Sequence, residues 1–212
     1  MLAQDYWNRI GSTKKFEDPL HLDKLTPYLP KSGSILEYGC GYGRMLKMLL
    51  EKGHRQLIGF DFAKAMIERG KSENPELDLR LLERSGEIPC KSASQNAVIM
   101  STVLCSMTDS EEKKRLMDEI YRVLAPGGIF YLTDFLLCNA PYYEEKYAQG
   151  LKDFGKWGMY TTSENLIVCH YTSQEILELL KPFDIKWFEQ FSFKTMNQNP
   201  ANTFHAIAQK IG

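Results

Sequence analysis

The stretch SILEYGCGYGR, residues 34 to 44, carries three glycines at alternate positions directly after a short apolar run. Glycine adopts positive φ at little cost and lets backbone N–H groups approach a ligand closely. The N-terminus of the helix expected to follow adds a partial positive charge. Three interpretations are open for this segment: a dinucleotide site, a site for a nucleoside that carries a sulfonium, or a turn that binds nothing.

The spacing of these glycines does not fit the dinucleotide fingerprint G-x-G-x-x-G. Counted from Gly39, the last position of that fingerprint is Arg44, and counted from Gly41 it is Leu46. The sequence instead reads E-x-G-x-G-x-G, beginning at Glu37. An acidic side chain inside the end of a strand suits an ammonium group better than it suits a diphosphate.

A second carboxylate, Asp61, follows the apolar run QLIGF, 22 positions after Gly39. At this spacing in a doubly wound fold, a carboxylate accepts hydrogen bonds from the ribose hydroxyls of a nucleoside. Asp61 can also be read as a solvated strand end, or as a cap for the helix that begins near AKAMIERG. Its position after a strand favours the ribose interpretation.

A third landmark is the segment RVLAPGGIFYLTDF, which begins at Arg122. Together with the glycine pattern and Asp61, it resembles the class I S-adenosylmethionine-dependent methyltransferases over residues 35–135. The stretch IGFDFAKAMIERG is similar to their small-molecule, "type 11"-like branch, which contains the ubiquinone and menaquinone methyltransferases. The resemblance implies S-adenosylmethionine as cofactor, S-adenosylhomocysteine as product and a small-molecule methyl acceptor.

The resemblance also assigns the cofactor site. Two alternative roles are open for Arg44: it forms a surface ion pair, or it faces the methionine carboxylate of the cofactor. Two departures from the family pattern stand out: Arg84 and Ser85 occupy the place of the usual acidic residue near the adenine, and Ala97 replaces the usual aspartate of the fourth strand. The expected cofactor-binding residues are Glu37, Gly39, Cys40, Gly41, Gly43, Arg44, Asp61, Phe62, Ser85, Gly86, Glu87, Ser101 and Thr102.

Strand and helix patterns alternate along the chain, which predicts an α/β fold. We expect a doubly wound, Rossmann-like, mostly parallel seven-stranded sheet with helices on both faces and an antiparallel C-terminal strand. Capping patterns predict helix starts at Asp18-Pro19, at Thr108 with Glu111, and at Thr172 with Glu175. Strands are expected at 34–38, 56–61, 77–82, 96–102, 129–135, 183–193 and 202–210, and helices at 19–29, 43–52, 63–74, 110–124 and 172–180.

The alternation fails between residues 136 and 171, and this part is rich in aromatic side chains. Long connections of this kind are often lids, so we interpret 136–171 as a cover over the pocket, inserted into one domain that spans 1–212. Residues 1–30 are expected to form a helical cap, in which the first aromatics act either as a flap or as docked packing. The expected lid residues are Tyr6, Trp7, Tyr142, Tyr143, Trp157, Tyr160 and Tyr171.

Methyl transfer from a sulfonium is an in-line displacement that depends mainly on alignment. If the acceptor is a hydroxyl, a side chain must also take or shield its proton, and the candidates are His170, Asp134 and Tyr160. A structural role is the alternative for His170. Cys40 and Cys105 have no base or metal partner nearby in the sequence, so they are expected to be small buried residues and not nucleophiles.

Net charge is −1, from 26 basic and 27 acidic residues, which disfavours nucleic acid as a partner. The five cysteines lack C-x-x-C pairing, and no metal is expected. Neither a membrane span nor an export signal is evident, so the cytoplasm is the expected location. Three other functions stay open: a non-catalytic S-adenosylmethionine-binding protein, an NAD(P)-dependent oxidoreductase, and a doubly wound domain that binds no nucleoside.

Overall fold

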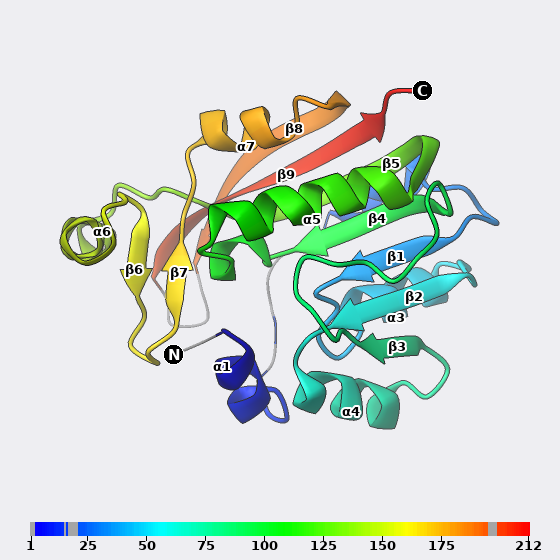
Figure 1. Ribbon diagram of the computed structural model, residues 1–212, viewed down its shortest axis with the longest axis horizontal. Coiled ribbons are helices and arrows are strands. Elements are labelled where there is room, and N and C mark those ends of the chain that lie inside the picture. The colour runs from blue at the N-terminus through cyan, green and yellow to red at the C-terminus, as the bar shows by residue number, and fades with distance from the viewer. Residues whose placement is uncertain (1–2, 15, 17–20, 195–198) are drawn as a thin grey trace.

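The computed structural model describes residues 3–14, 16, 21–194 and 199–212. Its centre is a seven-stranded sheet with strand order β3-β2-β1-β4-β5-β9-β8 (Figure 1). The five strands from β3 to β5 are parallel, and β9 runs antiparallel to both β5 and β8. The predicted doubly wound, mostly parallel sheet with an antiparallel C-terminal strand is confirmed.

Six strands of this sheet match the expected segments within two residues at each end, whereas β5 begins at residue 124 and not at the expected 129. The strands are β1 (Ile35–Tyr38), β2 (Leu57–Asp61), β3 (Asp78–Leu81), β4 (Gln95–Ser101), β5 (Leu124–Leu136), β8 (Phe183–Lys194) and β9 (Pro200–Lys210). The helices are α1 (Ala3–Ile10), α2 (Leu22–Leu25), η1 (Thr26–Tyr28), α3 (Arg44–Glu51), α4 (Lys64–Glu73), η2 (Leu104–Ser106), α5 (Ser110–Val123), α6 (Pro141–Phe154) and α7 (Ser173–Leu179).

Each face of the sheet has its own hydrophobic core. In β1 the side chains alternate, so that Leu36 packs in the cluster with α5 and α7, and Ile35 packs in the cluster with α2 and α3. Leu116 and Ile176 fill the first core, and Leu49 and Leu25 fill the second. All four residues of β1 are buried, as expected of a central parallel strand covered on both sides.

The strand order reverses between β1 and β4, because β2 and β3 follow β1 to one side while β4 and β5 lie on the other. In open parallel sheets, ligands bind beyond the carboxyl ends of the strands at this reversal. The glycine segment leaves β1 at that point and leads into α3. The topology therefore places the glycines where a ligand is expected.

The segment from 136 to 171 is folded and contains regular elements that the sequence did not predict. It forms α6 and the antiparallel hairpin of β6 (Met159–Thr161) and β7 (Ile167–Cys169), which extend from one side of the sheet (Figure 1). Gly150 of α6 packs so closely on this hairpin that a Cβ would lie 1.6 Å from the Met159 carbonyl oxygen. A third core joins this segment to Tyr6 of α1.

Two of the predicted helix caps can be compared with the structure. The capping box of Thr172 and Glu175 is confirmed. The box of Thr108 and Glu111 is wrong, because Asp109 is the N-cap of α5 and its carboxylate accepts the backbone N–H of Glu112 at 2.9 Å. An ionised oxygen is the stronger acceptor at a helix N-terminus. The predicted cap at Asp18-Pro19 lies outside the described residues.

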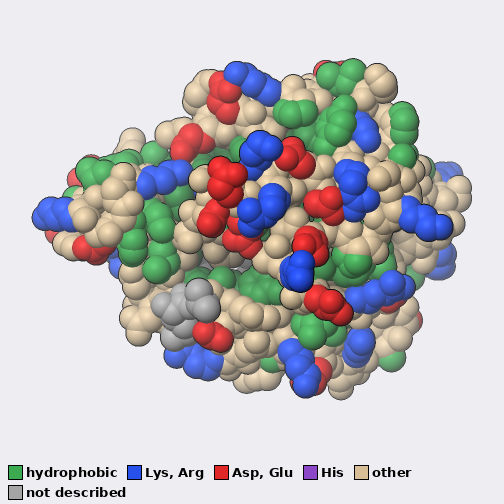
Figure 2. All heavy atoms as spheres, in the orientation of Figure 1, with side chains coloured by type: hydrophobic (Ala, Val, Ile, Leu, Met, Phe, Trp, Pro, Cys, Tyr) green, Lys and Arg blue, Asp and Glu red, His purple; other side chains and the backbone are tan. Residues whose placement is uncertain are grey.

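The described residues include no helix long and apolar enough to cross a membrane. Over the face of the molecule that carries α5, basic and acidic side chains are interspersed (Figure 2). No cluster of three or more His, Cys, Asp or Glu side chains able to hold a metal ion occurs among the residues described.

Candidate functional site

A pocket opens at the carboxyl ends of β1, β2 and β4. Its base is the glycine segment, and its rim includes the residues that follow β4 and two aromatic side chains of the N-terminal region. The lining residues are Trp7, Phe16, Glu37, Gly39, Cys40, Gly41, Arg44, Met45, Asp61, Phe62, Met66, Ser101, Thr102, Val103 and Ser106.

The glycine segment has the backbone conformation that its sequence predicts. Gly39, Gly41 and Gly43 all have positive φ, of 73°, 53° and 84°. At Gly39 the requirement is also steric, because a Cβ there would lie 2.3 Å from Cγ2 of Val103. The N–H groups of Gly39 and Cys40 both donate to the carbonyl oxygen of Phe60, which ties the segment to β2.

Glu37 projects into the pocket from β1 with only 4% of its surface exposed. Its Oε2 has no hydrogen-bond partner among the described residues. Burial raises the pKa of this carboxyl to about 8; the nearby Arg44 opposes the shift and Asp61 adds to it. A buried carboxyl with an unmet acceptor is costly unless a ligand supplies a donor, so the site is suited to a cationic hydrogen-bond donor.

Asp61 lies at the end of β2 and lines the same pocket. Its Oδ2 accepts the N–H of Gly41 at 2.8 Å, and its Oδ1 accepts the N–H of Ala63 at 2.8 Å. Burial raises the pKa of the Asp61 carboxyl, and both hydrogen bonds oppose that shift. Each oxygen keeps a further lone pair, so the carboxylate can still accept hydroxyl groups of a ligand.

Aromatic side chains from the N-terminal region cover the glycine segment. The ring of Phe16 stacks on Tyr42 at 5.6 Å, and the ring of Trp7 lies 5.7 Å from Phe16. The guanidinium of Arg69 lies 3.8 Å from the centre of the Tyr42 ring and donates to the carbonyl oxygens of the chain at residues 11 and 14. The cation–π contact links α4 to the glycine segment, and the two hydrogen bonds fasten the N-terminal segment to α4.

His170 lies in the insertion and not among the lining residues of the pocket. Its Nδ1 is 2.7 Å from the Tyr147 hydroxyl and its Nε2 is 3.3 Å from the Tyr160 hydroxyl, while its ring stacks on Phe135. Burial lowers the pKa of His170 to about 3, so the ring is neutral at ordinary pH. These contacts favour a structural role for His170 and Tyr160.

Asp134 is fully buried at the end of β5, also outside the pocket lining. Its Oδ1 accepts the N–H of Phe135 at 2.8 Å and its Oδ2 accepts the N–H of Cys105 at 3.2 Å. Burial raises the pKa of the Asp134 carboxyl to about 6, against these hydrogen bonds. Both oxygens are directed at backbone, which is the arrangement of a side chain that organises a loop.

Several other expected residues also lie away from the lining. Gly43 is the N-cap of α3, and the N–H of Gly86 donates to the Tyr38 hydroxyl at 2.8 Å. Glu87 forms an exposed ion pair with Arg84 at 3.5 Å. In the expected lid, Tyr142 and Trp157 are 43% and 45% exposed, whereas the remaining tyrosines are buried in packing contacts: Tyr6, Tyr143, Tyr160 and Tyr171.

Five lining residues were not predicted from the sequence. Val103 follows Thr102 directly and Ser106 lies four residues after it, so the expected site could have been extended along the loop after β4 to include them. Phe16 reaches the pocket only because its segment folds back over Tyr42. Met45 and Met66 carry no signal beyond helical periodicity.

Comparison with known proteins agrees with this geometry. Residues 36–132 match the model of a family described as a methyltransferase domain. The chain is 28% identical to a carboxy-S-adenosyl-L-methionine synthase of Campylobacter lari, across 82% of this chain and 77% of that protein. Residues 36–132 are a class I S-adenosylmethionine-dependent methyltransferase domain. S-adenosylmethionine is accordingly the cofactor of this enzyme.

Two further similarities describe the range of this family. The methyltransferase is 25% identical to a tRNA N(3)-methylcytidine methyltransferase of Drosophila melanogaster, over 68% of this chain but only 46% of that protein. A solved S-adenosylmethionine-dependent methyltransferase of Methanosarcina mazei superposes with a TM-score of 0.84, at 24% identity, over 92% of this chain and 99% of that one. The structural likeness concerns the fold.

Proposed function

We propose that this enzyme transfers a methyl group to a small, partly apolar molecule held under the aromatic cover of the pocket. The observation that carries the proposal is the pair of aromatic side chains Trp7 and Phe16, which line the pocket beside the glycine segment. A recess lined by aromatic side chains suits a molecule with one or two rings better than a polymer. The net charge of −1 supports the same choice.

Within that proposal, four groups hold the cofactor. Glu37 receives the amino group of its methionine part, and Asp61 accepts the ribose hydroxyls. Arg44 is placed beside Glu37 to face the methionine carboxylate. Gly41, whose positive φ of 53° favours glycine, is the fourth group, because its lack of a side chain lets the backbone lie close to a ligand.

The cofactor supplies a methyl group on a sulfonium, which is already activated for displacement. The protein therefore has to align the acceptor and exclude water, and alignment alone can contribute several kcal/mol, about 7–11 at the upper end. The aromatic cover excludes water, and the loop after β4 offers the hydroxyls of Ser101, Thr102 and Ser106 to the acceptor. A dedicated base is not required if the acceptor loses its proton after the methyl transfer, or without help from a side chain.

The relatives do not agree on an acceptor. The Campylobacter lari relative is named for a small-molecule product, and the Drosophila relative is named for a tRNA base. A binding protein without turnover is a further alternative, since Arg84 and Ala97 depart from the family pattern. These alternatives predict different products from the same assay.

Calorimetry with S-adenosylhomocysteine, followed by mass analysis of reactions with small-molecule extract or with total tRNA, tests the proposal. We expect binding, and methylation of a component of the small-molecule extract. Glu37→Gln should weaken binding, whereas the matched control Asp78→Asn, an exposed acid on β3, should not. Methylated tRNA, a carboxylated cofactor, or binding without any product would each reject the proposed acceptor class.

A further inference from the structure

The turn that follows β4 brings the hydroxyl of Ser106 to the pocket. Thr102 has a positive φ of 54°, a conformation that is unusual for a β-branched residue. Its N–H donates to the carbonyl oxygen of Thr133, and the chain then enters η2. Strained backbone of this kind persists where the surrounding structure fixes it, often at functional sites. The result is that Ser106, the last residue of η2, lines the pocket.

A buried carboxylate braces η2 from the side away from the pocket. Asp134 is fully buried, and its Oδ2 accepts the N–H of Cys105 at 3.2 Å. The thiol of Cys105 in turn lies 3.5 Å from the carbonyl oxygen of Thr102. A buried acid is expensive to keep unless it is hydrogen-bonded, and one of the hydrogen bonds that Asp134 accepts comes from the backbone of the turn.

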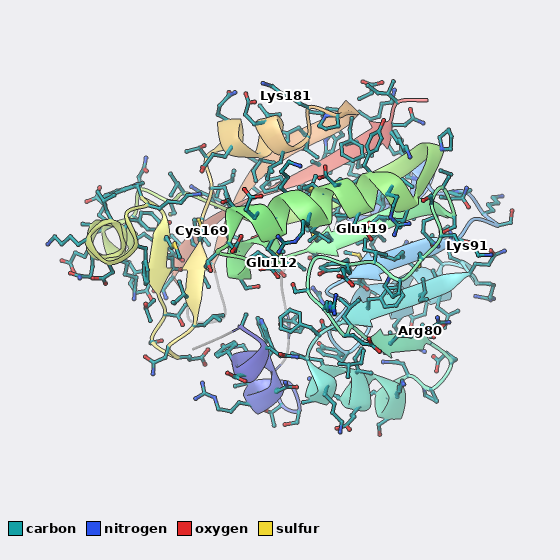
Figure 3. All side chains as sticks on the ribbon, viewed as in Figure 1. Arg80, Lys91, Glu112, Glu119, Cys169 and Lys181 are labelled. Atoms are coloured by element: carbon teal, nitrogen blue, oxygen red, sulfur yellow. The ribbon has the colours of Figure 1, made fainter. Side chains whose placement is uncertain are left out.

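A second brace reaches η2 through Tyr171. Its hydroxyl donates to the carbonyl oxygen of Leu104 at 2.8 Å and accepts from the Nζ of Lys113, which is 3.3 Å away. Lys113 is only 9% exposed although it carries an amine. Figure 3 shows this region, where Cys169 of β7 lies next to the N-terminal end of α5 that carries Glu112. An acid and an amine are thus both buried to hold one short turn.

The hydroxyls that this turn presents have their protons engaged. The Oγ1 of Thr102 donates to the carbonyl oxygen of Ser101 at 2.8 Å, and the Oγ of Ser106 donates to that of Val103 at 3.0 Å. A hydroxyl has one proton and two acceptor lone pairs. Toward the pocket, both oxygens therefore act as hydrogen-bond acceptors.

The charged side chains of the pocket also favour a hydrogen-bond donor without negative charge. Among its described lining residues the acids are Glu37 and Asp61, and the single cationic side chain is Arg44, which lies close enough to Glu37 to lower its pKa. An anionic methyl acceptor beside Ser106 would thus face oxygens that themselves accept hydrogen bonds. Apart from Arg44, no cationic side chain among these lining residues would be there to pair with it. A neutral molecule with an O–H or N–H group is the better match.

We propose that η2 is the acceptor-recognition element of this enzyme, in which Ser106 accepts a hydrogen bond from an O–H or N–H group of an uncharged acceptor. Asp134 and Tyr171 are positioning residues that hold η2 and do not contact the acceptor. This inference rests on the proposed small-molecule function, and it adds a substrate class to it.

The test uses three phenyl probes with the protein saturated with S-adenosylhomocysteine. p-Cresol offers an O–H donor without charge, 4-methylanisole lacks the donor, and 4-hydroxybenzoate adds a carboxylate. We expect ligand-observed NMR titrations to rank p-cresol above both others. Ser106→Ala should weaken p-cresol binding by about 2- to 12-fold, as for one neutral hydrogen bond, and should leave 4-methylanisole unchanged. Ser72→Ala, an exposed hydroxyl on α4, is the matched control.

Asp134→Asn tests the brace separately. We expect faster amide exchange at Cys105 and weaker p-cresol binding, with the affinity for S-adenosylhomocysteine within twofold of wild type. Equal or tighter binding of 4-hydroxybenzoate, no p-cresol binding, or an unaltered p-cresol affinity in Ser106→Ala would each overturn the inference. Loss of S-adenosylhomocysteine binding in the wild type would instead reject the proposed function, so the two failures are distinguishable.

Discussion

The Oδ2 of Asp61 lies 2.8 Å from the backbone nitrogen of Gly41 and accepts its N–H. The acid at the end of β2 therefore holds the glycine segment at the end of β1, in addition to facing the pocket. Because the same carboxylate also accepts the N–H of Ala63, it links the starts of two helices to one site. Side chains in such a position affect both folding and ligand affinity.

Asp61→Ala is expected to weaken S-adenosylhomocysteine binding by about 1.5–3 kcal/mol, the range for hydrogen bonds to a charged group. It should also lower the free energy of unfolding, since two buried N–H groups lose their acceptor. Calorimetry and urea unfolding measure the two effects, with Asp78→Ala, at an exposed position of β3, as control. Unchanged affinity together with reduced stability would show that Asp61 only supports the loop.

Glu37 predicts a pH-dependent affinity. Its pKa is about 8 in the free protein, so the carboxyl holds a proton below that pH, and the affinity for a ligand ammonium is highest above it. We expect the dissociation constant of S-adenosylhomocysteine to fall between pH 6 and pH 8, by up to about tenfold per pH unit. Calorimetry in buffers of different ionisation enthalpy should detect proton release, and Glu37→Gln should abolish it. A flat profile in the wild type would contradict the assignment.

The same raised pKa has a consequence for stability. The folded protein binds a proton at Glu37 between about pH 4.5 and pH 8 where the unfolded chain does not, so the stability contributed by this group falls as pH rises through that window. Urea unfolding of the ligand-free protein should show a shallower fall in Glu37→Gln than in the wild type. A ligand that donates to Oε2 should offset this loss.

His170 predicts the opposite trend. Its pKa is about 3 when folded and near 6.5 when unfolded, so the unfolded chain binds the extra proton and stability is lost as pH falls through this window. His170→Leu should be less stable than wild type at pH 7, because the hydroxyls of Tyr147 and Tyr160 lose their partner. The difference should shrink between pH 6 and pH 4, by up to about 1.4 kcal/mol per unit. A constant difference would mean that His170 titrates normally in the folded protein.

Glu164 connects α1 to the hairpin of β6 and β7. Its carboxylate accepts the hydroxyl of Tyr6 and lies 3.6 Å from the Nζ of Lys14, and its carbonyl oxygen accepts from Arg9 at 3.2 Å. Glu164→Ala should loosen α1 and weaken S-adenosylhomocysteine binding by a few-fold, since α1 carries Trp7 over the pocket. The loss should stay below about 1 kcal/mol, because half of this side chain is in solvent.

Limited proteolysis near residues 9–14 measures this loosening, with Glu189→Ala on β8 as control. Tyr6→Phe, which keeps the ring but removes the hydroxyl, should reproduce part of the effect. Protection equal to that of wild type in Glu164→Ala would show that packing of Tyr6 alone holds α1 in place.

Local rules accounted for most of the fold. The apolar runs that end at Tyr38 and Asp61 became parallel strands, since the alternating pattern of strands and helices admits few other arrangements. The predictions that failed also failed for local reasons. Thr108 and Asp109 are neighbours that can both cap a helix, and the insertion has no strong periodicity to reveal α6 and its hairpin.

The sequence by itself determined the base of the site, because glycines at 39, 41 and 43 and carboxylates at 37 and 61 act through backbone conformation and strand ends, which are local properties. Only the tertiary structure decided which side chains meet across the chain. The ring of Phe16 stacks on that of Tyr42, and His170 contacts two tyrosine hydroxyls and does not line the pocket. Asp134 of β5 accepts the N–H of Cys105 in η2. Such contacts depend on the packing of distant segments, whose energies no short stretch of sequence contains.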